Sequence, residues 1–550
     1  MKRSRVIAAC LAAGTGLIVL AGWSRAVPGA QSRHADVVSE QWPSLGIAPY
    51  EITLENGFRI VLVEDHRVPR VAASLQYRVG ALQERNGEHG AAHFLEHAIH
   101  QGTTTIGVKD PELDRKLLQA IHETEQELLA ERNAHRNDLR ERDVFFDEGD
   151  WPDTENGQRL RRKLYELEDE QSKNRTFWEE YNWYRRHGGL MRHTDPVPAN
   201  TGNEMMRIEV DLPRERLELF FRMEADRMVN AVMRGWEAQR FTVYEQFFVL
   251  QRNDTGRFFE ALNGTTGLAH PISIHTGGHE RDHAYWNRAS MLRMYDSYIV
   301  PNNATLALVG DMTPDEVRAL AATYFGGVPA APAPPADMDV EVEPPPRGSV
   351  RLDWLEPLDP SVIVRYRIPG VGHPDRPVFD VIARLLRGSD GLVAAAQKGT
   401  AGEWQANASQ NGSPNTLTIT GRAARDEDIQ ALEQVALGAI EALRQTPVDE
   451  ARLQRLRQDF RFEWELLRTS RGALATQIGS FAIADTWRTL RPFHEARSTA
   501  GAEDVRRAAQ RYLVPWNRVI ATTRRNPQPR AGGNPPGTQS PVEPQQGRPR

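Results

Sequence analysis

Two histidines and a glutamate lie within five residues of one another, in the run His93-Phe-Leu-Glu96-His97. On a helix, residues four positions apart share one face, so both imidazoles would point the same way, with the carboxylate between them. Two neutral imidazoles at this spacing can bind one zinc ion, and the carboxylate can activate a water molecule held by the metal. The motif therefore predicts a zinc-dependent peptidase.

The alternative interpretation of such a motif is a set of ordinary surface or capping residues. The residues around the motif favour the metal site instead, because they predict a largely buried helix. They are small or apolar: Ala91, Ala92, Phe94, Leu95, Ala98 and Ile99. Buried imidazoles and carboxylates need partners, and a metal ion supplies one.

The first thirty residues form a segment of their own. Three basic residues precede an apolar stretch from Val6 to Gly22, and small residues follow as far as Ala30. This order is typical of a secretory signal peptide over residues 1–30, with an uncleaved anchor as the alternative. No other apolar run approaches the roughly 20 residues that a spanning helix needs. We therefore expect a periplasmic or secreted product with no membrane span after cleavage.

Composition narrows the chemistry of that product. A chain of 550 residues is too long for one hydrophobic core, which predicts two or more domains. The formal net charge of −6 gives no indication of nucleic-acid binding. Cys10, the single cysteine, would be lost with the signal peptide. Disulfides and cysteine catalysis are then excluded, and a metal is left to histidine, carboxylate or amide ligands.

Residues 45–328 are expected to form an N-terminal domain that carries the histidine motif. Tyr50 to Tyr77 alternates as strands around a hairpin turn at Asn56-Gly57. A charged stretch at 110–187 has leucines at helical spacing on both sides of a turn, which predicts an inserted helical hairpin. Further elements are expected at Leu217–Val232, Trp236–Arg252 and Pro314–Tyr324 (helices) and at Thr305–Val309 (a strand).

A second domain is expected over residues 348–525. Seven prolines among alanines and acids mark residues 329–347 as the linker that precedes it. The order of strands and helices in the first domain then recurs in outline, without the histidine motif. Residues 526–550 are rich in Pro, Gly, Gln and Arg and are expected to be disordered.

Three further stretches accompany the motif: Gly80-x-x-x-Glu84, Glu224-Ala-Asp-Arg-Met228, and the run from Tyr298 to Asp311. Together with the motif they resemble the pitrilysin/insulinase-type metallopeptidases, the inverzincins, in which the zinc motif has this order. The nearest resemblance is to small bacterial members related to processing peptidases. It implies an α+β fold: two similar α/β domains, each a mainly antiparallel sheet packed with helices, form a clam-like chamber with zinc in the first half.

By this resemblance His93 and His97 are zinc ligands and Glu96 is the general base. The family's third ligand is a glutamate in an E-R-x-x-x-x-x-E pattern on a later helix. The corresponding stretch here runs from Gln239 to Gln246, with glutamine in place of both glutamates. A glutamine offers only a neutral carbonyl oxygen, which compensates the charge of the ion poorly.

The third ligand is therefore left open between two residues. Glu245 lies one position early and would need a rotation of the helix by about 100°. Gln246 stands in the direct register but lacks the charge. His100, three residues after His97, is a further candidate imidazole, although a surface position is the simpler expectation for it.

The substrate edge also departs from the family pattern. An Asn-Ala pair that helps to hold the peptide backbone appears as Pro198-Ala199. Proline has no backbone N–H and lacks the asparagine amide, which leaves Ala199 as the expected substrate-binding residue. The hairpin at 110–187 would cover the chamber mouth or build an interface.

Two main functions follow from these features, and a peptide-binding chaperone with a vestigial site is a third alternative. The first is a zinc metalloendopeptidase that hydrolyses unfolded or short peptides through a metal-activated water. The second is a catalytically weak or inactive subunit that binds peptides or scaffolds an active partner. The intact motif favours the first, whereas the glutamines and Pro198 favour the second. A homodimer, or a heterodimer with a related subunit, is expected in either case.

Overall fold

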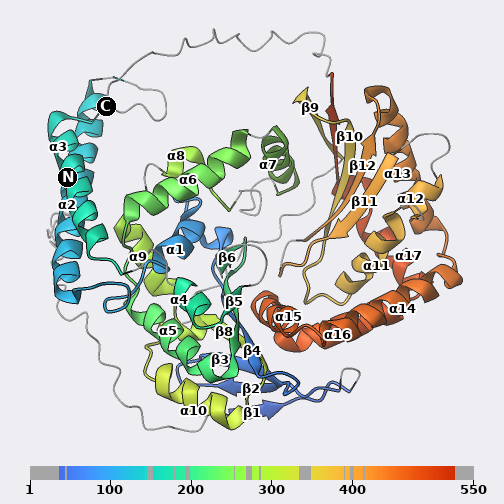
Figure 1. Ribbon diagram of the computed structural model, residues 1–550. Helices are drawn as coiled ribbons and strands as arrows, with labels where there is room; N and C mark the ends of the chain where they lie inside the picture. The colour runs from blue at the N-terminus through green and yellow to red at the C-terminus, as the bar shows by residue number, and fades with distance from the viewer. Residues whose placement is uncertain are drawn as a thin grey trace, which may run out of the picture.

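The computed structural model in Figure 1 describes most of the chain between residues 36 and 526. The described ranges are 36–43, 46–142, 144, 153–176, 181–191, 199–252, 254–267, 276–283, 286–332, 349–388, 391–396, 402–412 and 415–526. The predicted signal peptide, Pro198, most of the predicted linker and all but the first residue of the predicted tail lie outside these ranges. No helix in the described ranges is long and apolar enough to cross a membrane.

The first half is built on an eight-stranded sheet with the order β1-β2-β3-β8-β4-β7-β5, in which β6 also pairs with β7. Only the β3·β8 pair is parallel. The strands are β1 (Asp36–Ser39), β2 (Tyr50–Thr53), β3 (Arg59–Glu64), β4 (Arg70–Tyr77), β5 (Leu190–Met191), β6 (Ala199–Thr201), β7 (Met206–Pro213) and β8 (Ala304–Gly310). The predicted turn joins β2 to β3, where Gly57 has a φ of 82°.

Helices cover one face of this sheet and enclose the larger part of the first core. They are α1 (Ala91–Ile99), α5 (Leu217–Asn230), α6 (Trp236–Arg252), α9 (Arg288–Tyr298) and α10 (Pro314–Tyr324). Two more helices of this half, α7 (Asp254–Gly267) and α8 (Glu280–His283), pack on α6. Phe94 of α1 illustrates the packing, because its fully buried ring contacts the rings of Trp236 and Trp286. The helix that carries the histidine motif is thus part of the core, as the sequence predicts.

The inserted hairpin consists of two long helices, α2 (Pro111–Glu141) and α3 (Glu155–Lys173), followed by the short α4 (Tyr181–Arg186). The Asp110 side chain caps α2 by accepting hydrogen bonds from two backbone N–H groups, and Pro111 occupies the first turn. Figure 1 shows α2 and α3 side by side, on the side of the first half that lies away from the second sheet. Two long helices therefore form the predicted hairpin, and its second helix ends at Lys173, well before the predicted end of the insertion at residue 187.

The second half is built on a five-stranded sheet with the order β11-β12-β10-β13-β9. Its strands are β9 (Val350–Pro357), β10 (Ser361–Ile368), β11 (Gly402–Ala408), β12 (Asn415–Ala423) and β13 (Arg518–Arg524). Only the β9·β13 pair is parallel. Its helices are α11 (Arg376–Leu386), α12 (Leu392–Ala396), α13 (Ile429–Gln445), α14 (Glu450–Leu467), α15 (Arg471–Ala484), α16 (Leu490–Thr499) and α17 (Ala502–Tyr512).

The two sheets repeat one topology. The order β3-β8-β4-β7 in the first corresponds to β9-β13-β10-β12 in the second, and the single parallel pair falls at the same place. In both halves the sequence Tyr-x-Val-Pro-x-Asn precedes the last strand. Asn303 donates to the carbonyl of Arg78 at 3.1 Å, and Asn517 donates to the carbonyl of Arg367 at 2.9 Å. The prediction of two similar, mainly antiparallel α/β halves is confirmed.

Each half also covers the sheet of the other with one helix. Helix α15 packs on β4 and β8 of the first sheet, where Ile478 and Val309 belong to one buried cluster. Helix α7 packs on β9 and β13 of the second sheet, where Phe258 and Leu262 share a cluster with Ile363. Figure 1 shows α7 between α6 and the second sheet, and α15 below it. The halves are therefore joined at two places.

Candidate metal centre and peptide site

The start of α1 is fixed by a buried carboxylate. Glu84 accepts hydrogen bonds from the backbone N–H groups of Gly90 at 2.8 Å and Ala92 at 2.9 Å. Burial raises the pKa of Glu84 to about 8, although these two donors act in the opposite direction. Gly90 has a φ of 90°, and a Cβ there would lie 2.5 Å from the carbonyl oxygen of Gly277. Only glycine fits this helix start without strain.

The end of α1 is fixed by the Glu224-Ala-Asp-Arg-Met228 stretch of α5. Arg227 donates to the carbonyl of Ile99 at 3.0 Å and to the Glu224 carboxylate at 2.9 Å. Both side chains are fully buried, and Tyr184 donates to Glu224 at 2.5 Å. The stretch that carries part of the family resemblance thus serves to hold the motif helix.

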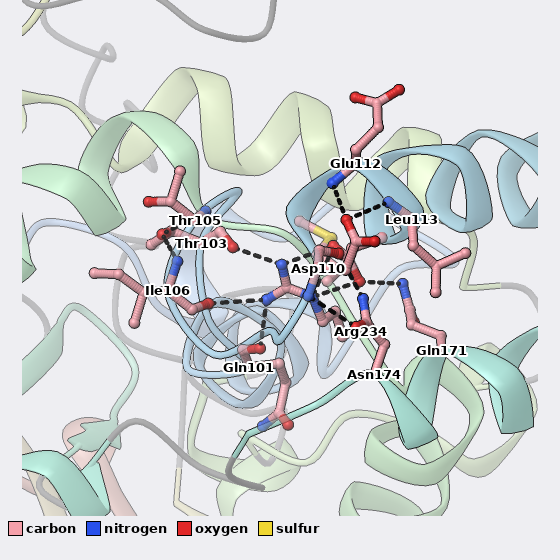
Figure 2. A network of polar contacts seen from close by, with 12 residues as sticks. Gln101, Thr103, Thr105, Ile106, Asp110, Glu112, Leu113, Gln171, Asn174 and Arg234 are labelled. Atoms are coloured by element: carbon pink, nitrogen blue, oxygen red, sulfur yellow. Dashed lines mark hydrogen bonds and ion pairs between the residues drawn. The ribbon is translucent and has the colours of Figure 1, made fainter.

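A second buried arginine holds the loop that follows α1, as Figure 2 shows. Arg234, in the turn between α5 and α6, forms an ion pair with Asp114 of α2 at 2.8 Å. It also donates to three carbonyls of the loop: those of Gln101 at 3.1 Å, Thr103 at 2.5 Å and Ile106 at 3.3 Å. One guanidinium thereby joins the loop after the motif helix, the inserted hairpin and the turn before α6. Arg234 is not among the residues that the sequence predicts for the site.

The two histidines lie side by side on α1, both half-buried. The ring centroids of His93 and His97 are 5.1 Å apart. Zinc binds an imidazole nitrogen at about 2.1 Å, so each centroid lies about 3.2 Å from the ion, and a tetrahedral angle separates two centroids by about 5.2 Å. The observed spacing fits two ligands of one ion.

Glu96 lies beside the histidines but is only 4% exposed. Thr201 of β6 donates its hydroxyl to one carboxylate oxygen of Glu96 at 2.6 Å. Burial raises the pKa of Glu96 to about 7, and the effect is partly offset by Thr201 and by the positive charge of Arg207. A carboxylate with such a pKa can take up and release a proton near neutral pH.

Helix α6 meets the motif at Gln239. The side-chain oxygen of Gln239 lies 3.3 Å from Nδ1 of His97. An amide oxygen can only accept, so this hydrogen bond requires the proton on Nδ1, which is the tautomer in which Nε2 carries the lone pair. The first of the two glutamines therefore orients a histidine.

Within the part of the chain that the structure describes, no third metal ligand lies beside the two histidines. Seven residues turn a helix to within about 20° of the starting direction, so Gln246 lies on the α6 face of Gln239, whereas Glu245 lies about 120° away. Both side chains are exposed. Among the described residues, no three His, Cys, Asp or Glu side chains are grouped to hold a metal ion. The residues present fit a site with two imidazole ligands, to which a weaker donor would be added.

His100 is not a surface residue. It is 2% exposed, and its Nδ1 lies 2.7 Å from the carbonyl oxygen of Glu96. Burial and the positive charge of Arg227 hold the pKa of His100 well below its usual value. The ring is thus a neutral group that closes the end of α1.

Strand β6 brings the expected substrate-binding residue next to α1. Ala199 pairs with Ile208 of β7, two positions before Thr201, which contacts Glu96. Ala199 is half-buried. Strand β6 therefore carries Ala199 close to the residue that contacts Glu96, while Pro198 falls outside the described residues.

A pocket of about 670 Å³ lies between α3 of the hairpin and α6. Its lining includes Tyr165 and Glu168 from α3 and Phe241 and Tyr244 from α6, and it reaches Gln239. The hairpin therefore forms one wall of a cavity whose other wall carries the residue that holds His97.

Comparisons with known proteins agree with this architecture. The profile described as "Insulinase (Peptidase family M16)" matches residues 59–134, which contain the motif. The profile described as "Peptidase M16 inactive domain" matches residues 285–460. No curated protein matches the sequence.

Several solved structures share the fold. A protease from Helicobacter pylori aligns over 86% of this chain and 98% of its own, with 16% identity and a TM-score of 0.65. Pitrilysin aligns over 90% of this chain and 47% of its own, with 16% identity and a TM-score of 0.63. The periplasmic protease PqqL from Escherichia coli aligns over 90% and 48%, with 16% identity and a TM-score of 0.61. The structural alignments show a common two-domain, clam-shaped fold, and at identities this low they show the fold alone. By its two profiles and its fold, the chain belongs to the insulinase-type (M16) peptidase family.

Proposed function

We propose that the protein is a zinc-dependent endopeptidase that hydrolyses unfolded or short peptides. The observation that carries the proposal is the geometry of the motif: the buried carboxylate of Glu96 lies beside two imidazoles whose spacing fits one ion. His93 and His97 would hold the zinc, with Gln246 or Glu245 as the third ligand. A bound zinc ion would supply Lewis-acid activation of a water molecule and of the peptide carbonyl.

The chain's own residues would position the peptide and move the proton. Glu96 would accept a proton from the attacking water and pass it to the leaving amine. Thr201 engages one oxygen of Glu96 and leaves the other for the proton. Gln239 would keep His97 in the tautomer that a metal requires. The peptide would add as a strand at β6, with Ala199 contributing backbone hydrogen bonds.

A catalytically weak or inactive subunit is the second candidate. Two observations favour it: glutamine stands at both positions of the later helix where the family has glutamate, and Pro198 stands where the family has asparagine at the substrate edge. PqqL is about twice as long as the aligned part of this chain, and its first half alone aligns over 94% of its length. We propose that two copies of this chain, or this chain and a related subunit, pair in the way that the two halves of PqqL are combined in one chain.

We also propose export to the periplasm. PqqL is a periplasmic protease, and residues 1–30 have the order of charges and apolar residues of a signal peptide.

The decisive experiment is cleavage of a quenched, unstructured peptide by the chain without residues 1–30, with and without a chelator. We expect chelator-sensitive cleavage, restored by zinc. Glu96→Gln should abolish cleavage while zinc content, measured by elemental analysis, stays unchanged. Glu112→Gln, at an exposed position of α2, is the matched control and should cleave normally. A protein that binds peptide and zinc but never cleaves would support the second candidate instead.

A further inference from the structure

A buried arginine on the second sheet makes no ion pair with any residue that the structure describes. Arg365 lies in the middle of β10 and is 8% exposed. Its Nε donates to the Thr418 hydroxyl at 3.1 Å, and its Nη1 donates to the side chains of Asn263 at 2.8 Å and Thr266 at 3.4 Å. All three partners are neutral. Its second amino group, Nη2, makes no hydrogen bond among the described residues.

The absence of a carboxylate distinguishes Arg365 from the other buried arginines described above. Arg227 and Arg234 each contact a buried carboxylate. Burial lowers the pKa of Arg365 to about 10, with no nearby negative charge to offset the effect. A buried cation without a counter-charge costs stability, because desolvation of the charge is not repaid. A ligand with a negative charge would repay it.

The repeat between the halves shows that this position does not require an arginine. The Asn303–Arg78 and Asn517–Arg367 contacts align the end of β4 with the end of β10. Gln76 then corresponds to Arg365, two positions before the matched arginine in each strand. Gln76 bonds the helix that covers its own sheet, at the carbonyl of Thr476 in α15, with a distance of 3.2 Å. A neutral amide therefore serves the same structural role in the first half.

The surface beside Arg365 is open and polar. The strand register places Thr418 opposite Arg365, and Asn407 of the edge strand β11 opposite Thr418. Side chains directly opposite one another share a face of the sheet. Asn407 and its neighbour on that face, Gln405, are exposed. This is the face that α7 partly covers, turned toward the first half, whereas α11 and α13 pack on the other face (Figure 1).

We propose that Arg365 binds a carboxylate of the peptide substrate, with the Thr418 and Asn407 row as the surface that receives the peptide. The carboxylate belongs either to an Asp or Glu side chain or to the C-terminus of the peptide. The inference rests on the proposed peptidase function, and it adds a preference for acidic peptides to it. Guanidinium groups pair with carboxylates through two parallel hydrogen bonds, for which Nη2 is available.

The test is peptide binding to the Glu96→Gln protein by fluorescence anisotropy, so that no peptide is consumed. Four versions of one unstructured peptide are compared: acidic side chains with a free C-terminus, side chains neutralised to Asn and Gln, C-terminus amidated, and both changes together. We expect the first to bind at least about tenfold more tightly than the last, since a charge-assisted hydrogen bond is worth that factor. The two intermediate versions identify which carboxylate is bound.

Variants assign the preference to the arginine. Arg365→Gln, the residue of the first half, should bind all four peptides alike. Asn407→Asp places a competing carboxylate at an exposed position on the same row, and it should also remove the preference if Arg365→Gln does not fold. Arg425→Gln removes an equal charge at an exposed site after β12 and should keep the preference.

Equal binding of the four peptides by the Glu96→Gln protein would overturn the inference. So would a preference that survives both Arg365→Gln and Asn407→Asp. If the wild-type chain cleaves peptides under these outcomes, the proposed peptidase function stands and only the role of Arg365 fails. If no peptide is bound or cleaved, both fail.

Discussion

Removal of Arg234 should loosen the loop after the motif helix more than the removal of any surface charge. Arg234 and Asp114 are 0% and 1% exposed, and the pair is supported by three loop carbonyls. Loss of one partner leaves a buried charge without compensation, which costs about 3–5 kcal/mol. Arg234→Met and Asp114→Leu should each reach this range, whereas the double variant should cost less than either, because it buries no charge.

Hydrogen–deuterium exchange of the loop and of α2 is the appropriate measurement, since it reports local opening in a chain with two halves. Arg115→Gln is the matched control: the same helix carries the Arg115–Glu112 pair, which is exposed, and its loss should leave exchange unchanged. Double-variant exchange equal to the sum of the two single effects would refute the assignment of the stability to the pair. Zinc content should fall together with loop protection, because the loop follows α1 directly.

Three further predictions concern the motif helix and its partners. Gln246→Glu should tighten zinc binding, measured by competition with a chromophoric chelator, and Glu245→Gln should not weaken it; the opposite result would assign the ligand to Glu245. The raised pKa of Glu84, about 8 against an ordinary value of 4.5, means that the folded state retains a proton that the unfolded chain releases. Stability should therefore fall as pH rises from 4.5 to 8, by up to about 1.4 kcal/mol per pH unit, and Glu84→Gln should flatten the thermal unfolding profile over this range. Thr201→Val should lower kcat with little change in KM, because Thr201 holds Glu96; an unchanged kcat would leave the hydroxyl without a catalytic role.

Much of the fold could be predicted from periodicity. The bounds of α6 and α10 coincide with the predicted Trp236–Arg252 and Pro314–Tyr324, and α10 begins with a proline after a capping threonine. Helix α7 was not predicted. It contains Gly256, Gly264 and neighbouring threonines, which are poor helix formers, and its buried residues pack on a sheet that lies more than eighty positions later in the chain.

The residues of the candidate site likewise fall into those that the sequence predicts and those that only the folded structure brings together. His93, Glu96 and His97 could be recognised because their spacing lies within one helix. Thr201 and Gln239 could not be connected to them, since these contacts span 105 and 142 positions and depend on how β6 and α6 pack on α1. His100 was expected at the surface, but the end of α1 is enclosed by α5, a tertiary feature that spacing alone does not predict.

The exchange of helices α7 and α15 has a consequence for how the chain is made and how it opens. A half released from its neighbour would present an uncovered apolar sheet, so each half depends on the other for solubility as well as for shape. The buried cluster around α15 is much larger than the one around α7. Separation would therefore begin at α7, with α15 acting as the pivot, and the helix that leaves first is the one joined directly to α6 and the residue that orients His97.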